Sequence, residues 1–254
     1  MILADRSDDQ IHARDRDAAL TLAACSDKGP VRRDNQDAWA MRPLEGGGAL
    51  VVLADGMGGH ADGGIASGLA VNAAVERLAA ALDPLGSLRE AVEDANRAIG
   101  ERRGLRGAVM GTTLVLAVVR DGRAAIANVG DSRAYVIKSG SAQQITLDHS
   151  WLAEEMRAGR IAAHSAAHDP RRNVLSRALT GDPVAADAFE LELGRGDTLM
   201  LCSDGVWEVL DDHTLAALLE SGPPLAEEVT EAVAAAIAQG STDNATVVAC
   251  RVDD

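Results

Sequence analysis

The order of apolar patterns along the chain most constrains its fold. Strand-length apolar runs come first, at 19–25 and 47–56, and another closes the chain at 244–252. Helical patterns follow the first strands directly, so strands and helices do not alternate as they do in a parallel α/β fold. The sequence therefore predicts an α+β fold built in layers, with strands from both ends of the chain.

Two consecutive helical patterns occupy the region after the first strands. Apolar residues recur at helical spacing between 62 and 82 and again at 88–99, on either side of Asp83-Pro84-Leu85-Gly86. The residues that set the first pattern are Val71, Val75, Leu78 and Leu82. We expect two amphipathic helices that pack as an antiparallel pair.

The middle of the chain is typical of a β-meander over 111–138, with Asp121-Gly122 as a type I′ turn between its first two strands. A loop-rich stretch over 150–183 follows, with one short helix at 151–160. Strands and helices then return before the last strand, at 189–194, 197–205, 211–222 and 223–240. In the last of these segments, an apolar stripe is formed by Leu225, Val229, Val233 and Ile237.

Length and composition favour one domain with an aliphatic core. Apolar residues make up 47% of the 254 residues, but the chain has only three Trp, one Tyr and one Phe to fill its interior. No linker or repeat divides it, so we predict a single domain over 18–254. Residues 1–17 are predicted to form a mobile charged tail.

Charge and cysteine usage exclude several classes of protein. The formal charge of −15 repels phosphate backbones and anionic lipids, so a nucleic-acid partner is not expected. Cys25, Cys202 and Cys250 fit no disulfide or zinc pattern and are predicted to be buried free thiols. No uncharged apolar run is long enough for a membrane span. The chain is expected to be cytoplasmic.

Five aspartates stand in similar local contexts, most of them beside an apolar strand. They are Asp37, Asp55, Asp131, Asp204 and Asp243. Taken singly, an Asp-Gly after a strand is a turn signal. If the strands lie side by side, however, the carboxylates would converge and raise one another's pKa unless cations lay among them. Oxygen ligands without clustered His or Cys favour a pair of Mg²⁺ or Mn²⁺ ions, which could turn a bridging water into a hydroxide-like nucleophile.

A phosphate monoester would also need a positive group to hold it. Arg32 stands five residues before Asp37 and could grip two phosphate oxygens with its planar guanidinium. The alternative is an ordinary exposed arginine on the surface, and the local sequence does not distinguish Arg32 from its neighbour Arg33 in this respect.

Six motifs, taken in order, make a family resemblance specific. They are SDKGPVRRDNQD, ADGMGGH, GTT, VGDSR, CSDGVWE and TDNATVV. Over residues 18–252 the chain resembles the PPM (type 2C) Ser/Thr protein phosphatases in their compact bacterial form. The resemblance implies a four-layer α-β-β-α sandwich, with two central antiparallel sheets flanked by helix pairs and metals in a cleft at one edge.

The same resemblance implies roles for single residues. Asp55 would bridge the two core ions, the Gly56 carbonyl would add a ligand, and Asp204 and Asp243 would complete the pair. Asp37 would act through bound water. Asp131, with Asp204, would match a weaker third metal site. Arg32 would match the phosphate-binding arginine, and residues 158–183 would correspond to the flap beside the cleft.

Two positions depart from the family pattern. Gln36 stands where many relatives carry an acid, which predicts somewhat weaker metal binding. Met57 stands where eukaryotic relatives carry a histidine, so His60 is the candidate general acid, with metal-bound water as the alternative. The remaining histidines show no ligand spacing and are expected to face solvent; they are His12, His149, His164, His168 and His213.

The expected function is therefore direct hydrolysis of phosphoserine and phosphothreonine in proteins, without a phosphoenzyme. The resemblance implies a Ser/Thr kinase and its targets as partners, and a monomer is expected. One alternative is a catalytically silent domain that binds phosphoproteins. Another is a phosphatase with the same chemistry that acts on one dedicated regulator.

Overall fold

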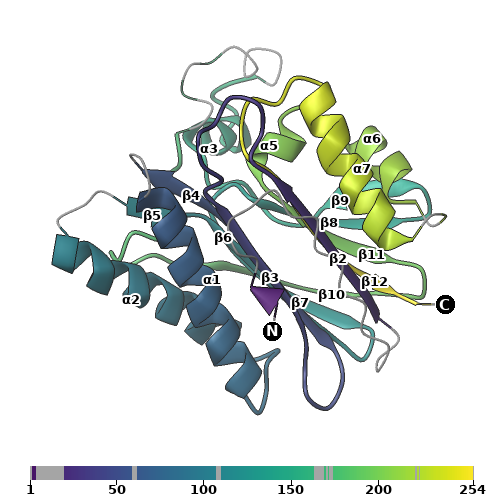
Figure 1. Cartoon of the computed structure of the whole chain (residues 1–254), viewed down its shortest axis with the longest axis horizontal. Coiled ribbons are helices and arrows are strands. Elements are labelled where there is room, and N and C mark those ends of the chain that lie inside the picture. The colour runs from purple at the N-terminus through teal and green to yellow at the C-terminus, as the bar shows by residue number, and fades with distance from the viewer. Residues whose placement is uncertain are drawn as a thin grey trace.

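The computed structural model describes residues 2–3, 20–58, 62–106, 110–162, 169, 171, 174–220, 222 and 224–253. Two antiparallel sheets face one another, and helices cover both outer faces (Figure 1). This arrangement confirms the predicted α+β fold with four α-β-β-α layers.

The first sheet has seven strands in the order β1-β3-β4-β6-β7-β10, with β5 added beside β4. The strands are β1 Ile2–Leu3, β3 Asp37–Pro43, β4 Ala49–Gly58, β5 Met110–Thr112, β6 Leu114–Arg120, β7 Arg123–Val129 and β10 Asp187–Glu192. Asp121 and Gly122 both have positive φ (52° and 71°), which confirms the type I′ turn between β6 and β7. Strand β1 lies within the segment predicted as a tail and pairs with β3, whereas residues 4–17 lie outside the described residues.

The second sheet has five strands in the order β2-β12-β11-β8-β9. The strands are β2 Leu20–Asp27, β8 Arg133–Lys138, β9 Ser141–Gln144, β11 Thr198–Cys202 and β12 Ala245–Val252. Strand β2 pairs with β12 along its whole length, from Asp27 opposite Ala245 to Leu20 opposite Val252. The predicted strands at both ends of the chain are present, and they pair with one another in this sheet.

The predicted meander over 111–138 is wrong in its last strand. Strand β8 pairs with β11 and β9 of the second sheet, not with β7. The chain crosses between the sheets at Gly130, whose φ of 110° suits glycine. This crossing carries Asp131 to the edge where both sheets end.

The helices divide between the two outer faces. Helices α1 (Asp62–Ala80) and α2 (Leu88–Arg106) cover the seven-stranded sheet as an antiparallel pair. The other sheet is covered by α5 (Asp204–Trp207), α6 (Asp212–Leu218) and α7 (Leu225–Ala238), while α3 (Trp151–Arg157) lies in the irregular stretch. No helix of the described segments is long and apolar enough to cross a bilayer.

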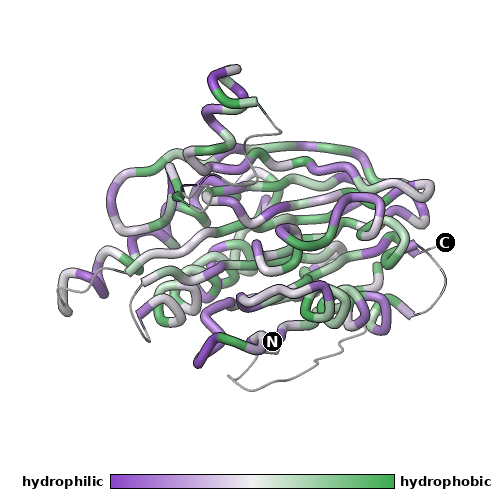
Figure 2. Tube along the Cα trace, turned by 90° about the horizontal axis from the view of Figure 1, so that it is seen from above, coloured by the Kyte–Doolittle hydropathy of each residue, from purple (hydrophilic) through white to green (hydrophobic). Residues whose placement is uncertain are grey.

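Three aliphatic clusters hold these layers together. Strand β4 shows the principle, because Leu50 and Val52 face the α1/α2 pair while Val51 and Leu53 face the other sheet. A third cluster joins the second sheet to α5, α6 and α7, and hydrophobic residues recur along strands and helices alike (Figure 2). All three cysteines are buried free thiols, as predicted.

Two details of the predicted helix stripes differ. Leu82 lies past the end of α1 and is fully exposed, because the helix ends before the stripe does. On α7, Leu225, Val229 and Val233 are buried, but Ala236 takes the place of the partly exposed Ile237.

Candidate active site

The predicted acids come from separate elements and gather at one edge of the two sheets. Asp37 opens β3 directly opposite Asp55 of β4. Asp131 lies in the crossing from β7 to β8, Asp204 begins α5 after β11, and Asp243 precedes β12.

A pocket of about 610 Å³ brings most of the predicted site residues together. Its lining includes Arg32, Gln36, Asp55, Gly56, Asp131, Asp204 and Asp243. Asp37 is not part of the lining. Its Oδ2 instead accepts hydrogen bonds from Ser203 Oγ (2.8 Å) and Thr246 Oγ1 (2.6 Å). These bonds tie Asp37, on the first sheet, to the ends of β11 and β12 in the second sheet.

The backbone around Asp55 is fixed by the two threonines of the GTT motif, Thr112 and Thr113. The Asp55 N–H donates to Thr113 Oγ1 (2.9 Å), and the Asp55 carbonyl accepts from Thr112 Oγ1 (2.8 Å) and the Thr113 N–H (2.9 Å). Thr113 Oγ1 also lies 2.7 Å from Ser132 Oγ, next to Asp131. The GTT motif therefore positions Asp55 and connects it to the segment that carries Asp131.

Gly56 is required at its position because of a close backbone approach. A Cβ at residue 56 would lie 2.2 Å from the carbonyl oxygen of Gly63 in α1. The Gly56 N–H donates to the Gln36 carbonyl (3.1 Å), and Ser67 Oγ donates to the same oxygen (2.6 Å). The start of α1 is thus packed directly against the loop that bears Gln36 and Asp37.

Asn244 holds that loop from the other side. Its Oδ1 accepts the Gln36 N–H (2.8 Å), and its Nδ2 donates to the carbonyls of Lys28 (2.8 Å) and Asp34 (3.1 Å). Asn244 therefore steadies the loop of Gln36 and Asp37 by hydrogen bonding.

The electrostatics of the pocket are unfavourable for the acids by themselves. Burial, followed by the charges of Asp37, Asp204 and Asp131, raises the pKa of Asp55 well above its ordinary value. Burial and the charge of Asp131 do the same to the pKa of Asp204. Burial raises the pKa of Asp37 to about 6 and the pKa of Asp131 to about 7. A cation among these carboxylates would offset this cost.

The donor set fits hard divalent cations. Asp37 Oδ1 and Asp204 Oδ1 are buried and have no hydrogen-bond partner, so each has an unused acceptor that a cation or its water could take. Within the described segments, no three Asp, Glu, His or Cys side chains converge closely enough to hold one ion by themselves. Ions here would therefore keep several water ligands, as Mg²⁺ does in proteins.

Arg32 is the one of the two candidate arginines that lines the pocket. It forms an ion pair with Asp243 Oδ2, and its side chain is 54% exposed. The guanidinium therefore lies at the mouth of the pocket, next to a carboxylate predicted to bind metal.

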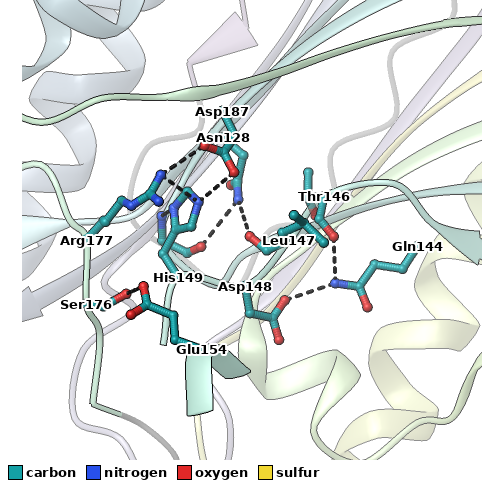
Figure 3. Close-up of polar contacts among 11 residues, drawn as sticks. Asn128, Gln144, Thr146, Leu147, Asp148, His149, Glu154, Ser176, Arg177 and Asp187 are labelled. Atoms are coloured by element: carbon teal, nitrogen blue, oxygen red, sulfur yellow. Dashed lines mark hydrogen bonds and ion pairs between the residues drawn. The ribbon is translucent and has the colours of Figure 1, made fainter. Parts of the chain in front are cut away.

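The structure does not test His60, which lies outside the described residues, but it corrects His149. The prediction that His149 faces solvent is wrong, because its side chain is 1% exposed. Its Nδ1 accepts the Gly130 N–H (3.1 Å), so Nε2 carries the proton and donates to Asp187 Oδ2 (3.1 Å) (Figure 3). Burial lowers the pKa of His149.

Arg177 is a pocket residue that the sequence did not reveal. Its Nη1 donates to Asp187 Oδ1 (2.9 Å), so Asp187 holds both Arg177 and His149 (Figure 3). The guanidinium adds a second positive group to the pocket that Arg32 lines. The only local signal was its place in the irregular stretch that resembles the family flap.

Comparison with known proteins agrees with this geometry. The family model described as Protein phosphatase 2C matches residues 32–242. A Listeria monocytogenes protein named serine/threonine phosphatase stp is 34% identical over 234 residues, which cover 88% of this chain and 92% of the relative.

Solved structures give the same result. The Mycobacterium tuberculosis serine/threonine phosphatase PstP/Ppp superposes with a TM-score of 0.84 at 35% identity, covering 92% of this chain and 99% of the other. A catalytic domain of PstP solved in complex with two manganese ions superposes with a TM-score of 0.82, also at 35% identity, with the same coverage of 92% and 99%.

Proposed function

Because this chain belongs to the protein phosphatase 2C family, we propose that it is a metal-dependent phosphatase that hydrolyses phosphoserine and phosphothreonine in other proteins. The observation that carries the proposal is the pocket in which four separate segments place Asp55, Asp131, Asp204 and Asp243 beside Arg32. Relatives and solved structures named as serine/threonine phosphatases support the same activity.

Two Mn²⁺ or Mg²⁺ ions suit the acids of the pocket, and a related catalytic domain was solved with two manganese ions. Asp55, the Gly56 carbonyl, Asp204 and Asp243 would hold the two core ions, and Asp131 with Asp204 would hold a weaker third. Asp37 would support the pair from behind the pocket. Lewis acidity toward the phosphate and a lowered pKa of water are what such ions supply when bound.

Arg32 binds the phosphate in this proposal. Its guanidinium pairs with Asp243, and its planar fork could accept two phosphate oxygens. With a metal bound, Asp243 would serve as a metal ligand and Arg32 would be available to the phosphate. Arg177, held by Asp187, is in place to neutralise charge on the other side of the pocket. His60 stays the candidate that protonates the departing serine oxygen.

The substrate would come from a kinase that phosphorylates serine and threonine in proteins. We propose the kinase and its targets as partners, and a monomeric cytoplasmic enzyme with a single catalytic domain over 18–254. A dedicated regulator as sole substrate is compatible with the same site.

Hydrolysis of p-nitrophenyl phosphate and of a phosphothreonine peptide with Mn²⁺ tests the proposal. Chelation should abolish both activities, and Asp55→Asn should lower kcat by about a thousandfold or more because the shared metal ligand is lost. Asp94→Asn is the matched control, since Asp94 is an acid paired with Arg77 and Arg97 on the outer helices. It should keep wild-type rates.

The same assay separates the enzyme from a silent phosphoprotein-binding domain. A silent domain would bind the peptide with Mn²⁺ and release no phosphate. The presence of all five predicted acids with Arg32 argues against that reading. Activity that survives in chelator would rule out the metal mechanism.

A further inference from the structure

A second, larger groove lies next to the active-site pocket. Its volume is about 1000 Å³, and its lining includes Arg32 and Asp243, which also line the pocket of the acids. The two depressions are therefore continuous through the arginine proposed to bind phosphate. Nothing in the proposed chemistry uses the remaining residues of the groove.

Exposed apolar side chains lie among the polar residues that line this groove. Leu147 and Met156 line it and are 46% and 36% exposed. Only five large apolar side chains are exposed in the described part of the chain, and two of them line this groove. Single exposed apolar residues are common, but two in one groove beside a catalytic pocket indicate a binding surface.

The floor of the groove is rigid. The Arg133 guanidinium lies 3.6 Å from the centroid of the Trp207 ring. Its Nε and Nη2 donate to the two oxygens of Asp148 (2.9 and 2.7 Å), and its Nη1 donates to Tyr135 Oη (2.8 Å). A groove floor that is already fixed in this way loses little conformational entropy when a ligand binds, and this favours affinity.

Two ion pairs lie along the groove, and the exposed Arg157 of α3 lines it as well. Arg133 is neutralised by Asp148, and Arg32 by Asp243. The mostly buried Leu152 of α3 and the half-buried Val209 after α5 also line the groove. A charged side chain would find no open partner in these pairs, whereas an apolar side chain could exchange water for Leu147 and Met156.

We propose that this groove, defined by Leu147, Leu152, Met156, Trp207 and Val209, binds the polypeptide that flanks the phosphorylated residue and accepts one of its apolar side chains. The inference rests on the proposed phosphatase function and adds a substrate preference to it. A peptide whose phosphate lies at Arg32 enters the groove directly, because Arg32 belongs to both surfaces.

The test compares two series of phosphoserine peptides, in which Leu or Asn is placed at successive positions on either side of the phosphoserine. Wild-type protein should prefer Leu over Asn by about tenfold in kcat/KM at the position that reaches the groove. The double variant Leu147→Asn with Met156→Gln should lose that preference, measured relative to its own rate on p-nitrophenyl phosphate, which has no flanking chain. Leu82→Asn is the control, because Leu82 is exposed and lies far along the chain on the α1–α2 connection.

Several outcomes would overturn the proposal. These are a wild-type enzyme that does not distinguish Leu from Asn at any position, a double variant that keeps the preference, or a Leu82→Asn variant that loses it. Fluorescence anisotropy of a labelled phosphopeptide measures binding to the groove independently of turnover. A protein that binds Leu peptides more tightly but hydrolyses nothing would refute the phosphatase and keep the groove, whereas turnover without preference would do the reverse.

Discussion

Two neighbouring groups of aspartates differ in what balances their charge. Asp55 and Asp204 lie in the metal pocket, where burial and other acids raise their pKa well above the ordinary value. Asp148 is paired with Arg133, outside the pocket. Asp187, also outside it, is paired with Arg177 and His149 (Figure 3). The hydrogen bonds of His149 and Arg177 hold the pKa of Asp187 below its ordinary value despite its partial burial.

This difference separates structural acids from functional ones. A structural acid has its counter-charge built into the chain, so folding alone satisfies it. The acids of the pocket have no ion pair with any other described residue except that of Asp243 with Arg32, so their balance must come from outside. The two groups should therefore respond in opposite ways to substitution and to metal.

Loss of one partner from a paired acid should lower the stability of the fold. Arg133→Met removes the guanidinium from an Asp148 side chain that is only 12% exposed, and also removes the stack on Trp207. We expect a loss of about 3 kcal/mol in the free energy of unfolding, because an uncompensated buried charge remains. Urea titration measures it.

Two further variants sharpen this result. Arg123→Met breaks the exposed pair with Glu190, whose side chains are 62% and 73% exposed, and should cost less than about 1 kcal/mol. Adding Asp148→Asn to Arg133→Met should recover part of the loss. Equal losses for Arg133→Met and Arg123→Met would show that the inner pair is no different from a surface pair.

Substitution of an unpaired acid of the metal pocket should instead stabilise the metal-free protein. Asp204→Asn removes one of several repelling carboxylates, so the metal-free variant should be more stable than metal-free wild type by about 1 kcal/mol. Mn²⁺ at a hundredfold excess over its Kd should stabilise wild type by about 2.7 kcal/mol and the variant far less. Urea unfolding with Mn²⁺ and with chelator gives both numbers. Equal stabilisation of the two proteins would place the ion elsewhere.

Much of this arrangement could be predicted because local patterns determine it. Helical spacing located α1 and α2, the Asp-Gly turn located the β6–β7 hairpin, and the acids at strand ends converge as the layered fold requires. The edge of the sheets collects strand ends, so residues there meet whatever their distance along the chain.

The errors arise where the decisive contact is distant in sequence. Strand β8 has the same apolar pattern whether it pairs with β7 or with β11, so its sheet could not be read from 133–138 alone. His149 is buried because of Gly130 and Asp187, neither of which marks a histidine as internal. Thr112 and Thr113 reach Asp55 across more than fifty residues.

The smallest expected effect concerns His149, whose buried hydrogen bonds require a neutral ring. Protonation would place a second N–H against the Gly130 N–H and a positive charge beside Arg177, whose Nη1 lies 3.3 Å from Nε2. Burial lowers the folded-state pKa below 6.5, so the unfolded chain binds more protons in acid and stability falls as pH drops below about 6.5.

The expected contribution is a slope of at most about 1.4 kcal/mol per pH unit below that point, since one proton is involved. The slope must be measured as the difference in unfolding free energy between wild type and His149→Gln. Asp37 and Asp131 have raised pKa values, so they increase stability on acidification in the same pH range. Asp187 has a lowered pKa and loses its share only at lower pH. Unfolding free energies measured from pH 7.5 to about 5.5 should therefore show a difference that shrinks on acidification, because only wild type pays for a neutral histidine. A constant difference would mean that His149 stabilises the fold through packing alone and that its hydrogen bonds to Gly130 and Asp187 tolerate its charge.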